Sequence, residues 1–233
     1  MKIAILADIH GNSIALEKVL NEARGKKIKK LFILGDLVGY YYRAKKVLEL
    51  LSEWDREVIR GNHERMLKII IEQPEFSEKY RRKCGSALDI VIKELNKDEI
   101  KYLQELPKNK IVEIDKIKFD LHHGAPQDED VRLYPDSPEV EFEKALAQSA
   151  DFVLVGHSHY QFKYCQFGKC LINPGSVGQS RLEGGIANWC IIDTGDKSVK
   201  LMKTKFNTKE LAEEVKLIDP EIPYLGQVLM GEK

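Results

Sequence analysis

The first third of the sequence repeats one unit three times: a short strand, a polar loop that contains glycine, and an amphipathic helix. Strands are predicted at 2–7, 31–34 and 57–60, and helices at 13–25, 44–51 and about 65–71. Parallel strands joined by crossover helices form a sheet that is covered on both faces. The repeat therefore predicts an α/β fold that begins with a parallel sheet.

The rest of the chain changes from helix to strand. Residues 77–106 have helical periodicity, whereas strands are predicted around 112–114, 117–121 and 152–155, with a helix at 138–149. Later hairpins pair 162–165 with 169–172 and 188–193 with 199–203, before a final helix at 207–216. The apolar tail, 217–233, is expected to pack on the body or to contact a partner.

No linker or composition break divides the chain, so we expect a single domain over residues 1–233. Two sheets packed together, with helices outside, are the simplest arrangement of these elements. Lys plus Arg and Asp plus Glu both number 37, which gives a formal net charge of zero. A long nucleic acid is therefore an unlikely partner, because binding to many phosphates favours a basic excess.

The chain is expected to be cytoplasmic and reduced. The apolar run from Ile3 is interrupted at Asp8, which is too early for a signal peptide or a membrane span. The cysteines have no C-x-x-C spacing; Cys165 and Cys170 flank a predicted turn at Gly168. The two are interpreted as half-buried strand cysteines, with a metal-binding pair as the alternative.

Five loops, each after a predicted strand, carry side chains of the kinds that bind metals. They are Asp8-x-His10, Gly35-Asp36, Asn62-His63, His123-Gly124 and Gly156-His157-Ser158-His159. Ligands of open α/β sheets bind outside the carboxyl ends of the strands, so these loops could converge at one edge. Carboxylate, imidazole and amide oxygen together favour divalent first-row metals over metals that prefer thiolates.

The number of candidate ligands favours two ions over one. There are seven: Asp8, His10, Asp36, Asn62, His123, His157 and His159. That exceeds the four of a closed zinc site, and it would fill two larger coordination shells if one carboxylate bridged. Two such ions clamp the attacking and leaving oxygens in a displacement at phosphorus and activate a water as nucleophile.

With these five loops in this order, the sequence resembles the calcineurin-like metallophosphoesterases. The run Asn173-Pro174-Gly175-Ser176-Val177-Gly178-Gln179 adds a similarity to the small prokaryotic phosphodiesterase-like branch. The resemblance implies an α/β/β/α sandwich of four layers, built from two mixed sheets with helices outside. It also implies a binuclear metal centre at the sheet ends, with Mn²⁺ expected and Ni²⁺, Fe²⁺, Zn²⁺ or Mg²⁺ as alternatives.

The resemblance also implies a role for each residue. Asp8, His10 and His159 are similar to the ligands of one metal. Asn62, His123 and His157 are similar to those of the other, and Asp36 to the bridging carboxylate. His63 matches a histidine that protonates the leaving alkoxide or steadies the transition state, and an imidazole can donate a proton near neutral pH. Asn12 and Arg60 are predicted either to contact the phosphate or to be structural.

Two places need separate interpretation. Strand alternation places His123 with the apolar residues of its strand and His122 on the opposite side, so His123 is the predicted ligand.

Many relatives have Gly-Tyr-Gly-Pro after the Gly-Asp pair, whereas this chain has Gly39-Tyr40-Tyr41-Tyr42-Arg43. The Asp-Arg-Gly run of protein phosphatases is also missing here. The tyrosines are expected either to line the mouth of the site or to pack helices or a subunit.

We therefore expect a metal-dependent phosphoric ester hydrolase, most consistent with a phosphodiesterase that attacks a small phosphate ester with a metal-bound hydroxide. A phosphomonoesterase or protein phosphatase of the same fold is one alternative. A non-catalytic scaffold, such as the retromer subunit that resembles these enzymes, is another, and a homo-oligomer is left open. Zero net charge does not oppose binding of a small phosphate ester, because bound divalent ions would supply the positive charge.

Overall fold

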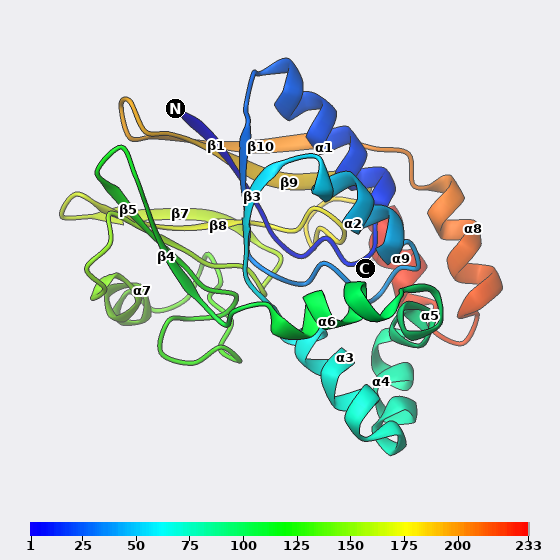
Figure 1. Cartoon of the computed structure of the whole chain (residues 1–233). Coiled ribbons are helices and arrows are strands. Elements are labelled where there is room, and N and C mark those ends of the chain that lie inside the picture. The colour runs from blue at the N-terminus through cyan, green and yellow to red at the C-terminus, as the bar shows by residue number, and fades with distance from the viewer. Residues whose placement is uncertain (233) are drawn as a thin grey trace.

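Two five-stranded mixed sheets, packed face to face, form the centre of the protein (Figure 1). This computed structural model describes residues 1–232; Lys233, the last residue of the predicted tail, lies outside the described residues. Helices α1 and α2 lie over one sheet, and α7 lies against the other sheet on the opposite side of the molecule. The predicted four-layer sandwich with helices outside is confirmed.

The first sheet contains the strands of the repeated unit. Its order is β10 (Ser198–Lys205), β9 (Ile186–Asp193), β1 (Lys2–Leu6), β2 (Lys30–Ile33) and β3 (Asp55–Val58). Strands β1, β2 and β3 are parallel, as the repeat predicts, whereas β9 pairs antiparallel with β1 and β10. Strand β3 ends before Arg60, so that residue belongs to the loop rather than to the predicted strand.

The second sheet has the order β4 (Lys110–Ile114), β5 (Ile117–Leu121), β6 (Phe152–Leu154), β8 (Lys169–Pro174) and β7 (Gln161–Gln166). Its three central strands are parallel, and the hairpin partners β4 and β7 form antiparallel edges. Both sheets therefore present the carboxyl ends of parallel strands, which positions the loops that carry the candidate ligands.

Helices of different lengths connect and cover these sheets. Around the first sheet they are α1 (Ser13–Gly25), α2 (Ala44–Ser52), α3 (Asn62–Glu72), α5 (Ala87–Glu94) and α6 (Lys97–Glu105). A short 3₁₀ turn (Pro74–Phe76) and α4 (Ser77–Cys84) follow α3, and α7 (Glu139–Leu146) covers the second sheet. The chain ends with α8 (Lys209–Ile218) and α9 (Tyr224–Met230).

Helix α3 begins earlier than the sequence pattern predicts. It starts at Asn62, not near Arg65, so Asn62 and His63 lie in its first turn. The Glu64 carboxylate accepts a hydrogen bond from the Gly61 N–H at 2.7 Å. This bond satisfies a donor at the helix start, and the first turn consequently holds both polar residues in fixed positions.

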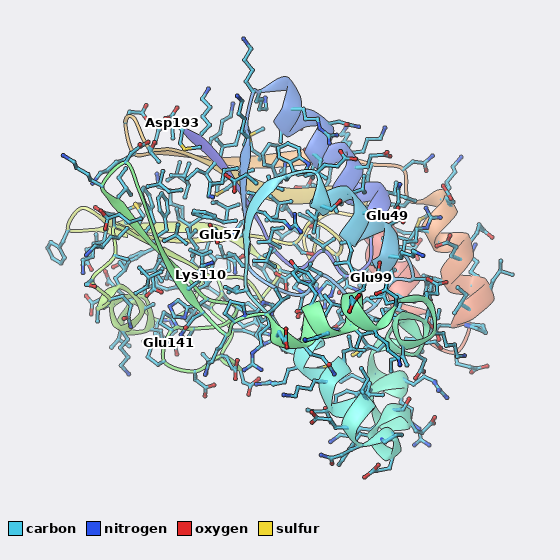
Figure 2. All side chains as sticks on the ribbon, in the orientation of Figure 1. Glu49, Glu57, Glu99, Lys110, Glu141 and Asp193 are labelled. Atoms are coloured by element: carbon cyan, nitrogen blue, oxygen red, sulfur yellow. A yellow bond between two sulfur atoms is a disulfide. The ribbon has the colours of Figure 1, made fainter. Side chains whose placement is uncertain are left out.

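Apolar residues from both sheets form the core between them. Phe32 packs edge-on against Phe119, and Phe119 stacks on Phe152, each pair with ring centroids 5.3 Å apart. At the edge of this interface, Lys110 of β4 donates to the Glu57 carboxylate of β3 at 2.7 Å (Figure 2). The burial of the aromatic residues contributes most here, because a half-exposed ion pair stabilises by at most about 1 kcal/mol.

The tail packs on the body of the protein through α9. Leu225 and Leu229 are buried in a cluster with Tyr41 and Tyr42. The Tyr41 hydroxyl donates to the Leu225 carbonyl at 3.2 Å, and the Tyr42 hydroxyl donates to Asp219 at 2.8 Å. Two of the three consecutive tyrosines therefore hold the C-terminal segment. Within residues 1–232, no helix has the length and apolar character that crossing a membrane requires.

The expectation that every cysteine is reduced is wrong for one pair. Cys165 of β7 and Cys170 of β8 are bonded as a disulfide, with their Cα atoms 4.1 Å apart. They are strand residues, as predicted, but they occupy directly opposite positions across the turn at Gly168. Opposite positions in a hairpin bring the two side chains together, which excludes them as a thiolate pair for a metal. Cys84 and Cys190 are free and buried.

Candidate metal centre

The polar loops at the ends of the parallel strands meet at one edge of the paired sheets. Asp8 follows β1, Asp36 follows β2, Asn62 opens the helix after β3, His123 follows β5 and His157 follows β6. All five side chains are buried. Neighbouring parallel strands end at the same edge, so residues far apart in the sequence come together there.

One group of ligand atoms comes from the loops after β1 and β6. Asp8, His10 and His159 offer donor atoms that all lie within 4.8 Å of one another. His10 Nε2 lies 3.0 Å from His159 Nε2, which in turn lies 3.4 Å from Asp8 Oδ1. Two imidazoles and a carboxylate at these separations form one half of the predicted centre.

A second group lies beside the first. Asp36, His123 and His157 also offer donor atoms within 4.8 Å of one another, and Asn62 Oδ1 lies 3.0 Å from His123 Nε2. Asp36 Oδ2 lies 3.4 Å from His123 Nε2 and 3.8 Å from His10 Nε2. The same carboxylate oxygen therefore faces both groups, which is the position that a bridging ligand requires.

Main-chain carbonyl groups orient three of the imidazoles. His10 Nδ1 lies 3.3 Å from the Val38 carbonyl, His123 Nδ1 lies 2.7 Å from that of Leu34, and His159 Nδ1 lies 2.9 Å from that of Gln179. A proton on Nδ1 satisfies each carbonyl and leaves the Nε2 lone pair directed toward the centre. In this orientation, a ring that carries its proton on Nδ1 can bind a cation through Nε2.

The residues present fit divalent metal ions. The Asp8 Oδ1 atom is buried and has no hydrogen-bond partner among the described residues. A buried carboxylate oxygen without a donor is costly, and a cation at this position would satisfy it. The donors are carboxylate, imidazole and amide, and the free thiols of Cys84 and Cys190 are outside both groups. This donor set suits first-row divalent ions.

Five residues of these loops have a left-handed backbone conformation. Asp8, His10, Asp36, His157 and His159 all have φ between 52° and 67°. Residues with a Cβ rarely adopt this left-handed conformation, and each such position costs roughly 1 kcal/mol or more. Five of the seven predicted ligands share it, so the fold holds them against their local preference.

The buried charges of the centre influence one another strongly. Burial alone would raise the pKa of Asp36, but the His123 and His63 imidazoles hold it well below its usual range. Burial also opposes protonation of His123, yet the Asp36 carboxylate raises the pKa of that imidazole to about 10. By contrast, burial and the neighbouring His123 lower the pKa of His157 to about 4. Without a cation, a proton on His123 balances the Asp36 charge, and metal binding would displace it.

His63 lies beside the centre, and its ring adjoins His10 and Tyr40 with centroids 4.7 Å away from each. Its Nε2 atom is 4.0 Å from Asp36 Oδ2, and its backbone N–H donates to Asp36 Oδ1 at 2.8 Å. Burial lowers the pKa of this imidazole, which Asp36 partly offsets.

A cavity of about 450 Å³ opens onto this centre. Its wall includes Asp36, Asn62, His63, His157 and His159 from the groups described above. Tyr40 also lines it, so this member of the tyrosine run lies at the mouth of the site whereas Tyr41 and Tyr42 pack helices. The volume is within the range of small-molecule sites.

Residues 1–197 match the calcineurin-like phosphoesterase superfamily domain. The chain belongs to this family. It is also 31% identical to an uncharacterized protein of Methanocaldococcus jannaschii over 97% of this chain and 96% of that protein.

Two solved structures are similar to this phosphoesterase fold along its whole length. A hypothetical protein from Pyrococcus horikoshii has a TM-score of 0.88 and 23% identity, covering 100% of this chain and 99% of that one. A metallophosphoesterase from Sphaerobacter thermophilus has a TM-score of 0.80 and 23% identity, covering 98% of each chain. The family, together with the clusters of side chains that could bind metal ions, indicates that this protein is a metal-dependent phosphoester hydrolase.

Asn12, Arg60 and His122 lie outside the residues that line the phosphoesterase cavity. The fully buried Asn12 caps α1 by accepting from the Ala15 N–H at 3.0 Å, and its amide donates to the Gly178 carbonyl at 2.9 Å. Arg60 pairs with Glu129 at 3.3 Å. These contacts fit the structural alternative, and contact of Asn12 or Arg60 with phosphate stays a prediction. His122 Nε2 lies 2.8 Å from Asp120 on the other face of β5.

Glu64 is a supporting residue to which the sequence analysis gives no role. Its buried carboxylate accepts hydrogen bonds from the backbone N–H groups of Asp36 at 2.9 Å and Leu37 at 2.8 Å, besides that of Gly61. Burial and the nearby Asp36 charge raise the pKa of Glu64 to about 7. Its position three residues after the glycine that precedes α3 is the available sequence signal, because a capping glutamate occurs there.

The segment from Asn173 to Gln179 is hydrogen-bonded to two of the loops that carry candidate metal ligands. Ser176 Oγ donates to the Asp8 carbonyl at 2.7 Å, and the Gly178 N–H donates to the same carbonyl at 3.0 Å. Asn173 Nδ2 donates to the Gly156 carbonyl at 2.8 Å. These bonds join the loop after β1 to the loop after β6, which keeps Asp8 and His159 together.

Proposed function

We propose that this protein is a two-metal phosphodiesterase that hydrolyses a small phosphate ester. The observation that carries the proposal is the position of Asp36 Oδ2, which is 3.4 Å from His123 Nε2 in one ligand group and 3.8 Å from His10 Nε2 in the other. A carboxylate shared between two sets of imidazoles is what two neighbouring cations require.

The first ion would be held by Asp8, His10 and His159, and the second by Asn62, His123 and His157, with Asp36 between them. Mn²⁺ is the proposed native ion, as the family resemblance implies, and the carboxylate and amide oxygens of the set suit it. When bound, the ions supply charge neutralisation at phosphorus and a water that is acidic enough to act as nucleophile at neutral pH.

His63 is proposed to donate a proton from Nε2 to the leaving alkoxide. This atom lies 4.0 Å from Asp36, at the wall of the cavity and close to the expected reaction centre. Burial lowers its pKa, so the proton is lost as pH rises through a value below 6.5 in the free enzyme. A bound anionic ester acts in the opposite direction and favours the protonated imidazole.

A diester is proposed rather than a monoester because of the size of the cavity. Its lining comes from α3, from the loop after β6 and from segments outside the candidate ligands. A volume of about 450 Å³ leaves room for two substituents on one phosphorus.

The test is an activity panel on the purified protein. Apo protein is loaded separately with Mn²⁺, Ni²⁺, Fe²⁺, Mg²⁺ and Zn²⁺, and each form is assayed with matched mono- and diesters. We expect about two Mn²⁺ ions for each chain and a higher kcat/KM for the diesters. His63→Ala should keep its metal and lose about 10²- to 10⁴-fold in kcat for an alkyl ester. It should lose much less with a p-nitrophenyl ester, because that leaving group needs no proton.

Each outcome of the panel decides between functions. Hydrolysis of monoesters alone would replace the diesterase by a phosphomonoesterase of the same fold. Protein that holds no metal tightly and hydrolyses no generic ester would be a non-catalytic scaffold. Equal losses in His63→Ala with both leaving groups would assign His63 to positioning rather than to proton donation.

A further inference from the structure

Arg132 and Arg181 differ from the other arginines of the chain. Arginines elsewhere have oxygen partners: Arg24, Arg43, Arg60, Arg65, Arg81 and Arg82 pair with carboxylates, and Arg56 donates to main-chain carbonyls. Among residues 1–232, neither Arg132 nor Arg181 makes a hydrogen bond or salt bridge. A guanidinium has five donors, and both arginines therefore keep theirs available for a ligand.

Both arginines line the cavity that opens onto the metal groups, and Lys83 of α4 lines it too. They come from three separate parts of the chain: the loop before α7, the loop after β8, and the end of α4. The protein as a whole has no net charge, so this grouping of positive charge at the cavity is a local feature. Arginine is suited to phosphate, because its planar fork donates two parallel hydrogen bonds.

The metal centre does not need these cations to bind one phosphoryl group. The Asp8 and Asp36 carboxylates neutralise half of the charge that two divalent ions would bring, and the remaining two positive charges are enough for the single negative charge of a phosphate diester. Three further cations exceed that requirement, which points to a second anionic group on the substrate.

The position of Arg181 shows in which direction such a substrate would extend. Its guanidinium carbon lies 5.2 Å from the centroid of the Tyr224 ring of α9. A stacked guanidinium is held in place while its N–H groups stay free. A second cavity of about 420 Å³ shares Tyr160, Arg181 and Tyr224 with the first. Arg181 thus lies where the two cavities meet, beyond the metal groups.

We infer that the substrate is an ester of nucleotide size that carries a second phosphoryl group, and that Arg132 and Arg181 bind this group while the first lies at the metals. The inference rests on the proposed function. Tyr134 and Tyr160, with ring centroids 5.6 Å apart, line the same cavity and offer aromatic surface to such a substrate. These two arginines are therefore specificity-determining residues.

The test compares two substrates that differ by one phosphate: thymidine 5′-(p-nitrophenyl phosphate) and the same ester with a 3′-phosphate. We expect the Mn²⁺-loaded protein to prefer the 3′-phosphorylated ester by about 10-fold in kcat/KM, as for one charge-assisted contact. Arg132→Gln and Arg181→Gln should each reduce this preference below about 3-fold, and Arg→Lys variants should restore part of it. Arg82→Gln, an exposed residue of α4, is the matched control and should keep the wild-type preference.

A binding measurement accompanies the kinetics. Calorimetry on the same loaded proteins should show thymidine 3′,5′-bisphosphate binding more tightly than thymidine 5′-monophosphate, with the difference lost in the arginine variants. If neither ester is hydrolysed, the proposed function fails. If both are hydrolysed without preference, or if the preference survives in both arginine variants, the function stands and the second phosphate site is refuted.

Discussion

The floor and the rim of the cavity are built in opposite ways. The floor consists of the seven candidate ligands and His63, which are buried, and main-chain carbonyl groups orient the imidazoles of His10, His123 and His159. The rim consists of Lys83, Arg132, Tyr134, Tyr160, Arg181 and Tyr224, which are exposed or half-buried and come from loops and helix ends.

This difference indicates that the floor and the rim have different functions. A buried floor, in which main-chain groups orient several ligands, can hold cations in one arrangement whatever ester is bound, because its atoms have little freedom to move. A rim of long side chains on loops can differ between relatives without disturbing that arrangement. The floor should therefore control whether hydrolysis occurs, and the rim should control which ester is hydrolysed.

The largest effect is expected for Asp36→Asn. An amide cannot bridge two cations as a carboxylate does, and this side chain faces both ligand groups. We expect at least about 10³-fold loss of kcat, since even supporting residues around metal ligands typically cost 10- to 100-fold. Elemental analysis should show fewer than two bound Mn²⁺ ions.

Asp120→Asn is the matched control for that change. Asp120 is also a buried carboxylate near an imidazole, but it lies beside His122 outside the ligand groups. Its variant should keep both ions and most of the activity. Full metal content in Asp36→Asn would contradict a shared carboxylate.

Gly39→Ala should give the next largest effect. A Cβ at Gly39 would lie 1.9 Å from His63 Nδ1, at a φ of +92°. His63 must therefore move, and we expect about 10²-fold loss of kcat for an alkyl ester while metal content is kept. Single-turnover kinetics together with metal analysis would separate the two properties.

Gly168→Ala controls for backbone strain. Gly168 also has a positive φ, +77°, but nothing lies within 4 Å of a Cβ there. This variant should lose roughly 1 kcal/mol of stability and no activity. Equal losses of activity in both alanine variants would show that the effect of Gly39→Ala is not transmitted through His63.

Strand-end residues of the floor could be predicted from the sequence, because parallel strands bring their carboxyl ends to one edge. Strand alternation placed His123 and His122 on opposite faces, as the structure shows. Backbone conformation could be predicted only in part: Asp and His adopt a positive φ more often than most residues, but no local pattern shows that Asp8 and His159 do so here. That conformation is imposed by tertiary contacts such as the bond from Ser176 to the Asp8 carbonyl.

The rim could not be predicted in this way. Tyr224 belongs to a tail whose apolar residues show no clear helical period, yet α9 forms there because Leu225 and Leu229 are buried against Tyr41. Arg181 follows the glycine-containing segment that braces the metal loops, but its lack of a carboxylate partner depends on the whole fold. Contacts between distant segments leave little trace in local sequence patterns.

Glu64→Gln should have a smaller effect on activity than Asp36→Asn and Gly39→Ala. Glutamine has one acceptor oxygen, whereas the Glu64 carboxylate accepts from the backbone of Asp36, Leu37 and Gly61 through both oxygens. We expect a loss of about 2 kcal/mol in unfolding free energy and about 10-fold weaker metal binding. Chemical denaturation and metal titration would measure these separately. Unchanged metal affinity would show that Glu64 supports folding alone.

Tyr41→Phe should have the smallest effect and should act on the rim alone. The change removes the hydroxyl that donates to the Leu225 carbonyl, next to the residue on which Arg181 stacks. We expect about 1 kcal/mol less stability and a 2- to 3-fold smaller preference for the 3′-phosphorylated ester. Turnover of bis-p-nitrophenyl phosphate should stay unchanged, because the hydroxyl donates to a carbonyl of α9 and not to a floor residue. Tyr164→Phe, which removes a hydroxyl bond to Glu139 at the second sheet, should leave the preference at its wild-type value. If both tyrosine variants lowered turnover of the simple diester equally, changes outside the floor would affect hydrolysis itself. Separate roles for the floor in hydrolysis and for the rim in substrate choice would then be refuted.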